Sequence, residues 1–179
     1  TEGGIWVGNS YGVTVENNIS NGNTTLSVDG QGIFIDETSE YCIVRFNSCN
    51  DNLGSATANS GMGISIYNGN NNTVYKNTTS GNKHGIWVGH ADSLANTIYN
   101  NTNYSNSEAQ IFIQNTVLAN ETTVKNNIGS GGTYGIQTTN AIIETNNCMF
   151  NASSADFQGL TKDASSITTD PGFRDAAND

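Results

Sequence analysis

Short stretches of alternating hydrophobic and variable positions recur along this 179-residue chain. In one kind, a glycine or glutamine precedes an isoleucine, a variable position and a second residue that is β-branched in every copy. The copies begin at Gly4, Gly32, Gly63, Gly85, Gln110 and Gly135, at spacings of 28, 31, 22, 25 and 25 residues. Alternation over so few residues predicts short β-strands with one buried face.

A second pattern lies between these strands and places an asparagine three residues after a valine or isoleucine. Its copies are Val15–Asn18, Val44–Asn47, Val74–Asn77, Ile98–Asn101, Val124–Asn127 and Ile143–Asn146. Five residues later a further asparagine recurs in every copy except the fifth, where Gly132 stands. Single turns of this kind cannot bury their apolar faces alone, but turns stacked at about 4.8 Å can. We therefore predict an all-β parallel solenoid of about six turns.

The recurring asparagines predict a structural ladder. Their amides both donate and accept, so amides stacked in register satisfy the polar groups of a buried corner from turn to turn. The predicted ladder consists of Asn18, Asn47, Asn77, Asn101, Asn127 and Asn146.

The residue that follows each valine or isoleucine of the second pattern is expected to point outward. In this column Glu16 is predicted to lie beside Arg45, Tyr75 beside Tyr99, and Lys125 beside Glu144. Each adjacent pair contributes about 0.2–1 kcal/mol and favours the correct register.

Composition narrows the functional classes. The net charge of -10 argues against a nucleic acid or an anionic membrane surface as partner, and no apolar run is long enough to cross a membrane. With 29 Asn and 5 Leu, the chain matches neither a helical protein nor a leucine-rich repeat. Its three cysteines form no C-x-x-C pair, so each is expected to be a buried thiol.

These repeats, from Gly4 to about Phe150, resemble the right-handed parallel β-helix repeat family. The family includes pectin- and alginate-acting enzymes and carbohydrate-binding surface proteins. The tail Asp170–Asp179 is similar to the Asp-Pro-x-Phe segment that closes many secreted β-helix proteins. The resemblance implies right-handedness and an extracellular or cell-surface location. The length predicts a single domain over 1–179, with a repeat core of about 4–151 and a tail of 152–179. The resemblance also implies that this domain is a segment of a longer protein.

The variable position of the first pattern carries a column of aromatic residues. Because aliphatic residues flank it, alternation directs this position outward. An exposed aromatic column marks a contact surface. It predicts stacking on a polysaccharide, cover by a loop such as 50–62 or by terminal segments, or an interface between copies. The aromatic members are Trp6, Phe34, Trp87 and Phe112.

Candidate chemistry is sparse. The Asn-Thr-Asp, Asp-Asp and Gly-His-Gly motifs of polygalacturonase-like enzymes are absent, as is the Asp-Pro-His motif of alginate epimerases. Lys76 and Lys125 are candidate bases but lie two turns apart, about 10 Å, and are expected to be solvated. His84 and His90 flank one strand and are expected at the surface.

No cofactor is expected, with one calcium candidate. Calcium needs several oxygen ligands, and four acidic residues flank the second strand of the first pattern. They are Asp29, Asp36, Glu37 and Glu40.

Together these features predict a polysaccharide-binding or adhesive module without a complete catalytic site. The alternatives are a polysaccharide lyase with a diverged or partial site, and a structural spacer that assembles through the aromatic column or the open solenoid ends.

Overall fold

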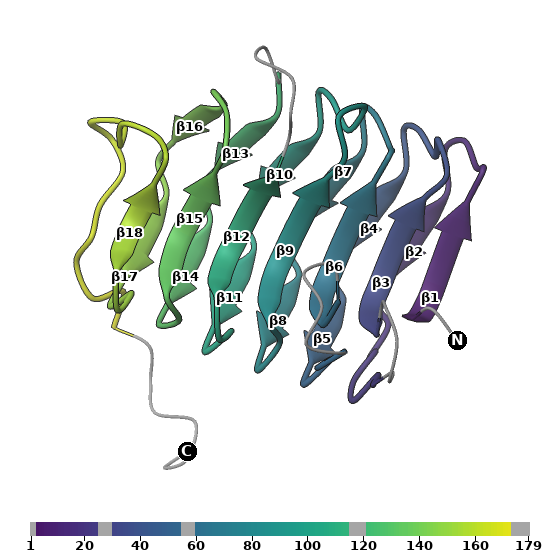
Figure 1. Ribbon diagram of the computed structural model, residues 1–179, viewed down its shortest axis with the longest axis horizontal. Helices are drawn as coiled ribbons and strands as arrows, with labels where there is room; N and C mark the ends of the chain where they lie inside the picture. The colour runs from purple at the N-terminus through teal and green to yellow at the C-terminus, as the bar shows by residue number, and fades with distance from the viewer. Residues whose placement is uncertain (1–2, 25–29, 55–59, 115–120, 173–179) are drawn as a thin grey trace.

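The computed structural model describes residues 3–24, 30–54, 60–114 and 121–172. They form a parallel β-solenoid whose turns stack along one axis (Figure 1). The predicted fold class is therefore confirmed. No helix among the described residues is long and apolar enough to span a membrane.

Three parallel sheets make the walls of the solenoid. The seven-stranded sheet contains β1 (Gly3–Gly8), β3 (Gln31–Asp36), β6 (Met62–Tyr67), β9 (His84–Gly89), β12 (Ala109–Gln114), β15 (Tyr134–Thr138) and β18 (Ala155–Gln158). The six-stranded sheet contains β2 (Thr14–Glu16), β4 (Ile43–Arg45), β7 (Thr73–Tyr75), β10 (Thr97–Tyr99), β13 (Thr123–Lys125) and β16 (Ile143–Thr145). The five-stranded sheet contains β5 (Ser48–Asn50), β8 (Thr78–Ser80), β11 (Thr102–Tyr104), β14 (Ile128–Ser130) and β17 (Cys148–Phe150).

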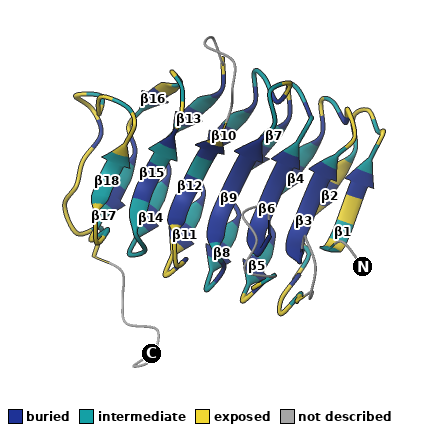
Figure 2. Cartoon of the chain, in the orientation of Figure 1, coloured by how far each residue is buried: buried dark blue, intermediate teal, exposed yellow. Residues whose placement is uncertain are grey.

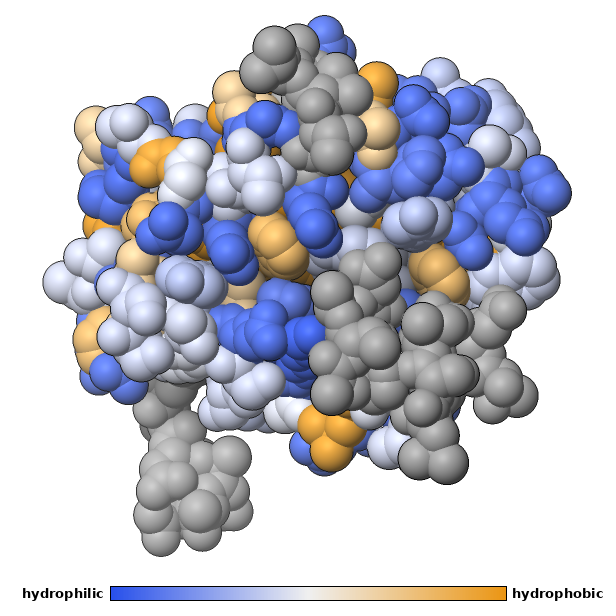
Figure 3. Space-filling model, in the orientation of Figure 1, coloured by the Kyte–Doolittle hydropathy of each residue, from blue (hydrophilic) through white to orange (hydrophobic). Residues whose placement is uncertain are grey.

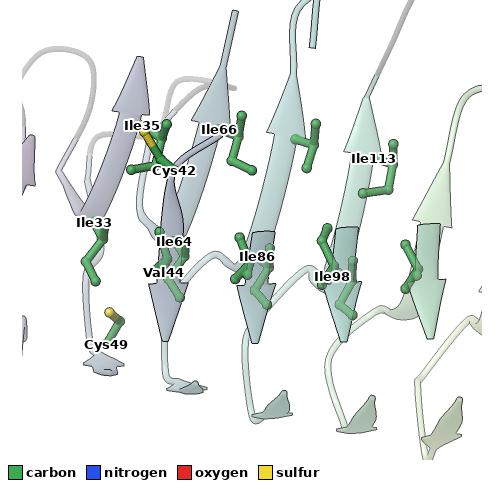
Figure 4. Packing of buried hydrophobic residues seen from close by; sticks show 14 of the residues in the cluster. Ile33, Ile35, Cys42, Val44, Cys49, Ile64, Ile66, Ile86, Ile98 and Ile113 are labelled. Carbon is green, nitrogen blue, oxygen red and sulfur yellow. The ribbon is translucent and has the colours of Figure 1, made fainter. Parts of the chain in front are cut away.

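The isoleucines of the first pattern stack in register inside the solenoid. Ile33 pairs with both Ile5 and Ile64, and Ile111 pairs with both Ile86 and Ile136. Figure 4 shows this column facing the valines and isoleucines of the six-stranded sheet. Full burial of one such side chain contributes about 1.5–3 kcal/mol. The stacked apolar column is therefore the core, and Figure 2 shows burial concentrated in the central strands.

The asparagine ladder forms at the corner between the six- and five-stranded sheets. The backbone N–H and the amide of Asn47 both donate to Oδ1 of Asn77, at 3.0 Å each. Asn77 repeats this arrangement with Asn101, and Asn101 with Asn127. Asn18 makes the same bonds to Asn47. Five of the six predicted members are thus confirmed.

The sixth predicted member is wrong by one residue. Asn127 donates to Oδ1 of Asn147 at 2.9 Å from its backbone N–H, and Asn146 lies outside the ladder. Lys125 consequently lies opposite Thr145, so the predicted Lys125–Glu144 pair does not form.

Glu144 occupies the inward position that valine or isoleucine holds in the other turns. It is 7% exposed, and its carboxylate accepts hydrogen bonds from the Asn147 amide, the Asp163 N–H and the Ser166 hydroxyl. Three donors offset the cost of burying the carboxylate. Ile143 is exposed instead, because the shifted register keeps the amide ladder continuous.

A second ladder forms from the later asparagines. Asn23 donates to Asn52, Asn52 to Asn82, and Asn82 to Asn106. Gly132 offers no side chain in the next turn. The Gln110 amide replaces it, because its Oε1 accepts from Asn106 and its Nε2 donates to the carbonyl oxygens of Asn106 and Gly131.

A third set of stacked amides was missed by the sequence analysis. Asn72 donates from its backbone N–H to Oδ1 of Asn96 at 2.9 Å, and the Cys42 N–H donates to Oδ1 of Asn72 at 2.8 Å. The sequence does contain a pattern that could have revealed them, because Asn72 and Asn96 stand five residues before Asn77 and Asn101.

Candidate functional site

The outer column of the six-stranded sheet carries charged and aromatic side chains in register. Arg45 Nε lies 2.6 Å from Glu16 Oε2, and the rings of Tyr75 and Tyr99 stack with centroids 4.8 Å apart and planes 4° apart. Lys125 continues the column, with its ammonium 5.9 Å from the centroid of Tyr99. Two of the three predicted cross-strand pairs are therefore confirmed.

Hydrogen bonds and charges within this column shift the pKa values of Arg45 and Tyr99. Arg45 Nη1 donates to the Tyr75 hydroxyl at 2.8 Å, and this bond, followed by the Glu16 contact, raises the pKa of Arg45. Desolvation raises the pKa of Tyr99, and the adjacent Tyr75 adds to the rise, while Arg45 opposes it. Because the Tyr75 oxygen accepts from Arg45, its own hydroxyl hydrogen is left to donate outward.

The corner beside this column carries Phe46 and Lys76. The Lys76 ammonium lies 5.3 Å and the Arg45 guanidinium carbon 5.6 Å from the centroid of Phe46, and the Phe46 ring meets Tyr75 edge-on at 6.1 Å. A shallow groove of about 400 Å³ runs along the corner between Ile19, Phe46 and Lys76. We call the following set the tyrosine face: Arg45, Phe46, Tyr75, Lys76, Tyr99 and Lys125.

The sequence predicted that several members of the tyrosine face point outward, but it did not predict that they form one surface. Phe46 was missed entirely. Its signal was its position directly before a ladder asparagine, where Asn17, Asn100 and Asn126 stand in other turns.

The predicted aromatic column on the seven-stranded sheet is in register but mostly covered. Trp6 pairs with Phe34, and Trp87 with Phe112. Trp6 is 47% exposed, whereas Phe34 is 6% and Trp87 2% exposed. Phe34 and Trp87 therefore point outward but are covered, which agrees with cover as one of the three predicted alternatives and not with a column open along its whole length. Whether the column binds a ligand stays a prediction.

Neighbouring side chains account for part of the cover over Trp87. Its indole N–H donates to Gln114 Oε1 at 3.2 Å, and the Tyr67 ring stacks on it at 5.8 Å. Viewed onto the seven-stranded sheet, Figure 3 shows a mostly hydrophilic surface with isolated hydrophobic residues.

His84 is buried, contrary to the expectation of a surface histidine. Its Nδ1 accepts from the Ala109 N–H at 3.3 Å, and its Nε2 lies 3.2 Å from Glu108 Oε2. Burial, followed by the charge of Lys83, lowers the pKa of His84 to about 4. The nearby Glu108 carboxylate favours the charged imidazole, but burial outweighs this contact. The imidazole is therefore neutral at pH 7, with both nitrogens occupied. His90 is half-buried, with its ring 4.9 Å from that of Tyr67.

The predicted calcium ligands are not brought together. Asp36, Glu37 and Glu40 belong to no group of three or more His, Cys, Asp or Glu side chains that could hold a metal within the described residues. Asp29 lies outside the described residues.

The thiols and thioethers lie in or near the core. Cys42, Cys49, Met62 and Met149 are buried, and burial raises the pKa of Cys49 to about 12. Cys148 is half-buried, so the buried-thiol prediction is correct for two of the three cysteines.

A comparison with known protein families identifies the family to which this solenoid belongs. The sequence model of a family described as periplasmic copper-binding protein (NosD) matches residues 1–116. The chain belongs to the NosD family. The periplasmic description of the family is consistent with the expected extracellular or cell-surface location. No curated protein and no solved structure matches.

The family description names copper, so we consider whether the side chains of this chain could bind a copper ion. Copper sites use histidine, cysteine and methionine. Here Cys42, Cys49 and Met149 are buried in the apolar cluster, and both nitrogens of His84 have partners. No three or more His, Cys, Asp or Glu side chains of the described residues form a group that could hold a metal ion. These side chains therefore do not fit a copper ion.

Proposed function

We propose that this NosD-family solenoid is a periplasmic or cell-surface module that binds an extended glycan along its outer face. The observation that carries the proposal is the tyrosine face. It joins three aromatic rings and three cations in one continuous contact network on successive turns.

The geometry of the face suits a polymer that lies along the solenoid axis. Successive turns repeat their outer groups at about 4.8 Å, so one chain of sugars meets equivalent groups several times. Tyr75 and Tyr99 stack on each other and therefore offer ring edges and hydroxyls, which donate to and accept from sugar hydroxyls. Recognition is consequently expected to rest on hydrogen bonds more than on ring faces.

The burial of Phe34 and Trp87 is the reason for placing the site here. Side chains that are 6% and 2% exposed cannot present their rings to a sugar, whereas Phe46 is 45% exposed. Trp6 is the one exposed aromatic residue of the predicted column, and it stands alone in the first turn.

Affinity electrophoresis through gels that contain single polysaccharides tests the proposal. We expect at least one polysaccharide to retard the protein, and Tyr75→Ala/Tyr99→Ala to weaken its Kd about 10-fold through loss of hydroxyls and packing. Tyr104→Ala is the matched control, because Tyr104 is exposed on the five-stranded sheet. Retardation of the double variant equal to wild type, with both folded by circular dichroism, would remove the site from this face.

The same polysaccharides can serve as substrates in an assay for lyase activity. A rise in unsaturated-uronate absorbance during incubation would favour the lyase hypothesis over a module that only binds.

A further inference from the structure

The tyrosine face is where the positive charge of this acidic chain gathers. The whole chain has 6 Lys+Arg against 16 Asp+Glu, and the face holds three of the six cations. Arg45 is paired with Glu16. Lys76 and Lys125 take part in none of the ion pairs found among the described residues. Two cations on this face therefore lack an acidic partner there.

Phe46 and Lys76 stand at backbone positions that neither residue type favours. The residue before the ladder asparagine has positive φ in each turn, and it is asparagine at Asn17, Asn100 and Asn126, with φ of 57°, 55° and 55°. Phe46 and Lys76 adopt the same conformation, with φ of 55° and 52°. Outside glycine and asparagine this conformation costs about 1–2 kcal/mol per residue. Tyr41, Ala95 and Ser105 adopt it as well at other corners of the solenoid, so the conformation belongs to the corners, and only the side chains distinguish the tyrosine face.

Aromatic rings hold the two unpaired ammonium groups in place. Lys76 lies over Phe46 at 5.3 Å, and Lys125 over Tyr99 at 5.9 Å. Such contacts orient a cation without neutralising it, so an anion can still pair with it. Strands β7 and β13 are separated by β10, which sets the two lysine-bearing turns about 10 Å apart.

We infer that the ligand of the tyrosine face is an anionic polysaccharide. This inference rests on the proposed glycan-binding function and specifies its substrate class. Acidic groups of the polymer pair with Lys76 and Lys125, and the sugar between them meets the hydroxyls of Tyr75 and Tyr99. Tyr75 and Tyr99 stack on each other and offer edges and hydroxyls, which suit sugar hydroxyls better than the bases of a single-stranded nucleic acid, since bases bind by stacking on free ring faces.

Binding of polygalacturonate, measured by calorimetry at low salt, tests the inference against the same polymer with its carboxyl groups methyl-esterified. We expect esterification to weaken the Kd at least 10-fold and added salt to weaken polygalacturonate binding. Lys76→Gln/Lys125→Gln should lose the preference for the acidic form, while Lys76→Arg/Lys125→Arg, which keeps both charges, should retain it.

Three other outcomes of these binding measurements would contradict the inference. Equal affinity for both polymers would overturn the inference and leave the proposed function standing. Binding of neither polymer, nor of any other glycan tried, would overturn both. Single-stranded DNA that binds as tightly as polygalacturonate would overturn the assignment to a polysaccharide.

Discussion

At the residue scale, His84 links the stability of the solenoid to pH. Its folded-state pKa of about 4 lies below the ordinary value of 6.5, because the imidazole is buried. Between pH 6.5 and pH 4 the unfolded chain binds a proton that the folded chain does not, so stability falls as the pH is lowered through this window. The difference of about 2.5 pKa units corresponds to about 3 kcal/mol.

His84→Gln isolates this contribution, since glutamine can accept from the Ala109 N–H and donate to Glu108 without titrating. We expect the free energies of unfolding of wild type and variant, from urea melts, to diverge by about 3 kcal/mol from pH 7 to pH 4. Parallel pH profiles for the two proteins would contradict a buried neutral imidazole.

The burial of His84 also shows what the sequence could not reveal at this scale. Part of its cover comes from Phe112 on the next turn, whose ring centroid lies 5.1 Å away and which no local sequence pattern places beside it. The same limit applies to Phe34 and Trp87. Alternation predicts which way a side chain points and not what lies over it.

At the scale of elements, the asparagine ladder fixes the register between turns. Asn77 sits in its middle and accepts from the Asn47 N–H while its amide donates to the Val44 carbonyl. Asn77→Ala leaves these buried groups without partners, at about 1–3 kcal/mol for each group. We expect the free energy of unfolding to fall by about 2–4 kcal/mol in chemical denaturation.

Asn18→Ala is the matched control, because Asn18 is half-exposed at the first turn of the same ladder and water can replace its bonds. A smaller loss, about 1 kcal/mol, is expected there. Equal losses at both positions would show that the ladder contributes no more than an ordinary surface asparagine.

The ladder also explains the one register error. The sequence pattern favours Ile143 as the inward residue of the sixth turn, on hydrophobicity alone. The structure turns Glu144 inward, because Asn147 then completes the ladder and the Asp163–Ser166 segment supplies donors to the carboxylate. Those donors lie outside the repeat, so inspection of the repeat could not show them.

At the scale of the whole molecule, repetition made the fold predictable from one sequence. Six copies of two patterns define the strands, the stacking and the core, whereas the tyrosine face depends on contacts between turns that no single copy contains. Phe46, Tyr75 and Lys76 come together because β4 and β7 are neighbours, although about 30 residues separate them along the chain.

The positions of the potential copper ligands across the whole molecule predict that the chain does not bind copper. Because the soft side chains of the described residues are dispersed through the core, titration with Cu(I) or Cu(II) is expected to give no saturable heat and no thiolate-to-copper absorbance. A one-to-one transition that raises the Tm would show that this chain holds copper as the NosD family description states.

The turn that contains Gly132 excludes the ladder asparagine by its backbone as well as by the Gln110 side chain. Restoring asparagine at Gly132 cannot succeed alone, since a Cβ there would lie 2.4 Å from the Asn106 carbonyl oxygen and 2.6 Å from Gln110 Nε2, at a φ of 74°. Losing Gln110 would leave the Asn106 amide with only its longer bonds to the carbonyl and hydroxyl oxygens of Thr79, at 3.4 and 3.3 Å. Since the Asn106 and Glu108 carbonyl oxygens also crowd this position, an asparagine there would need a different backbone path as well as a change at Gln110.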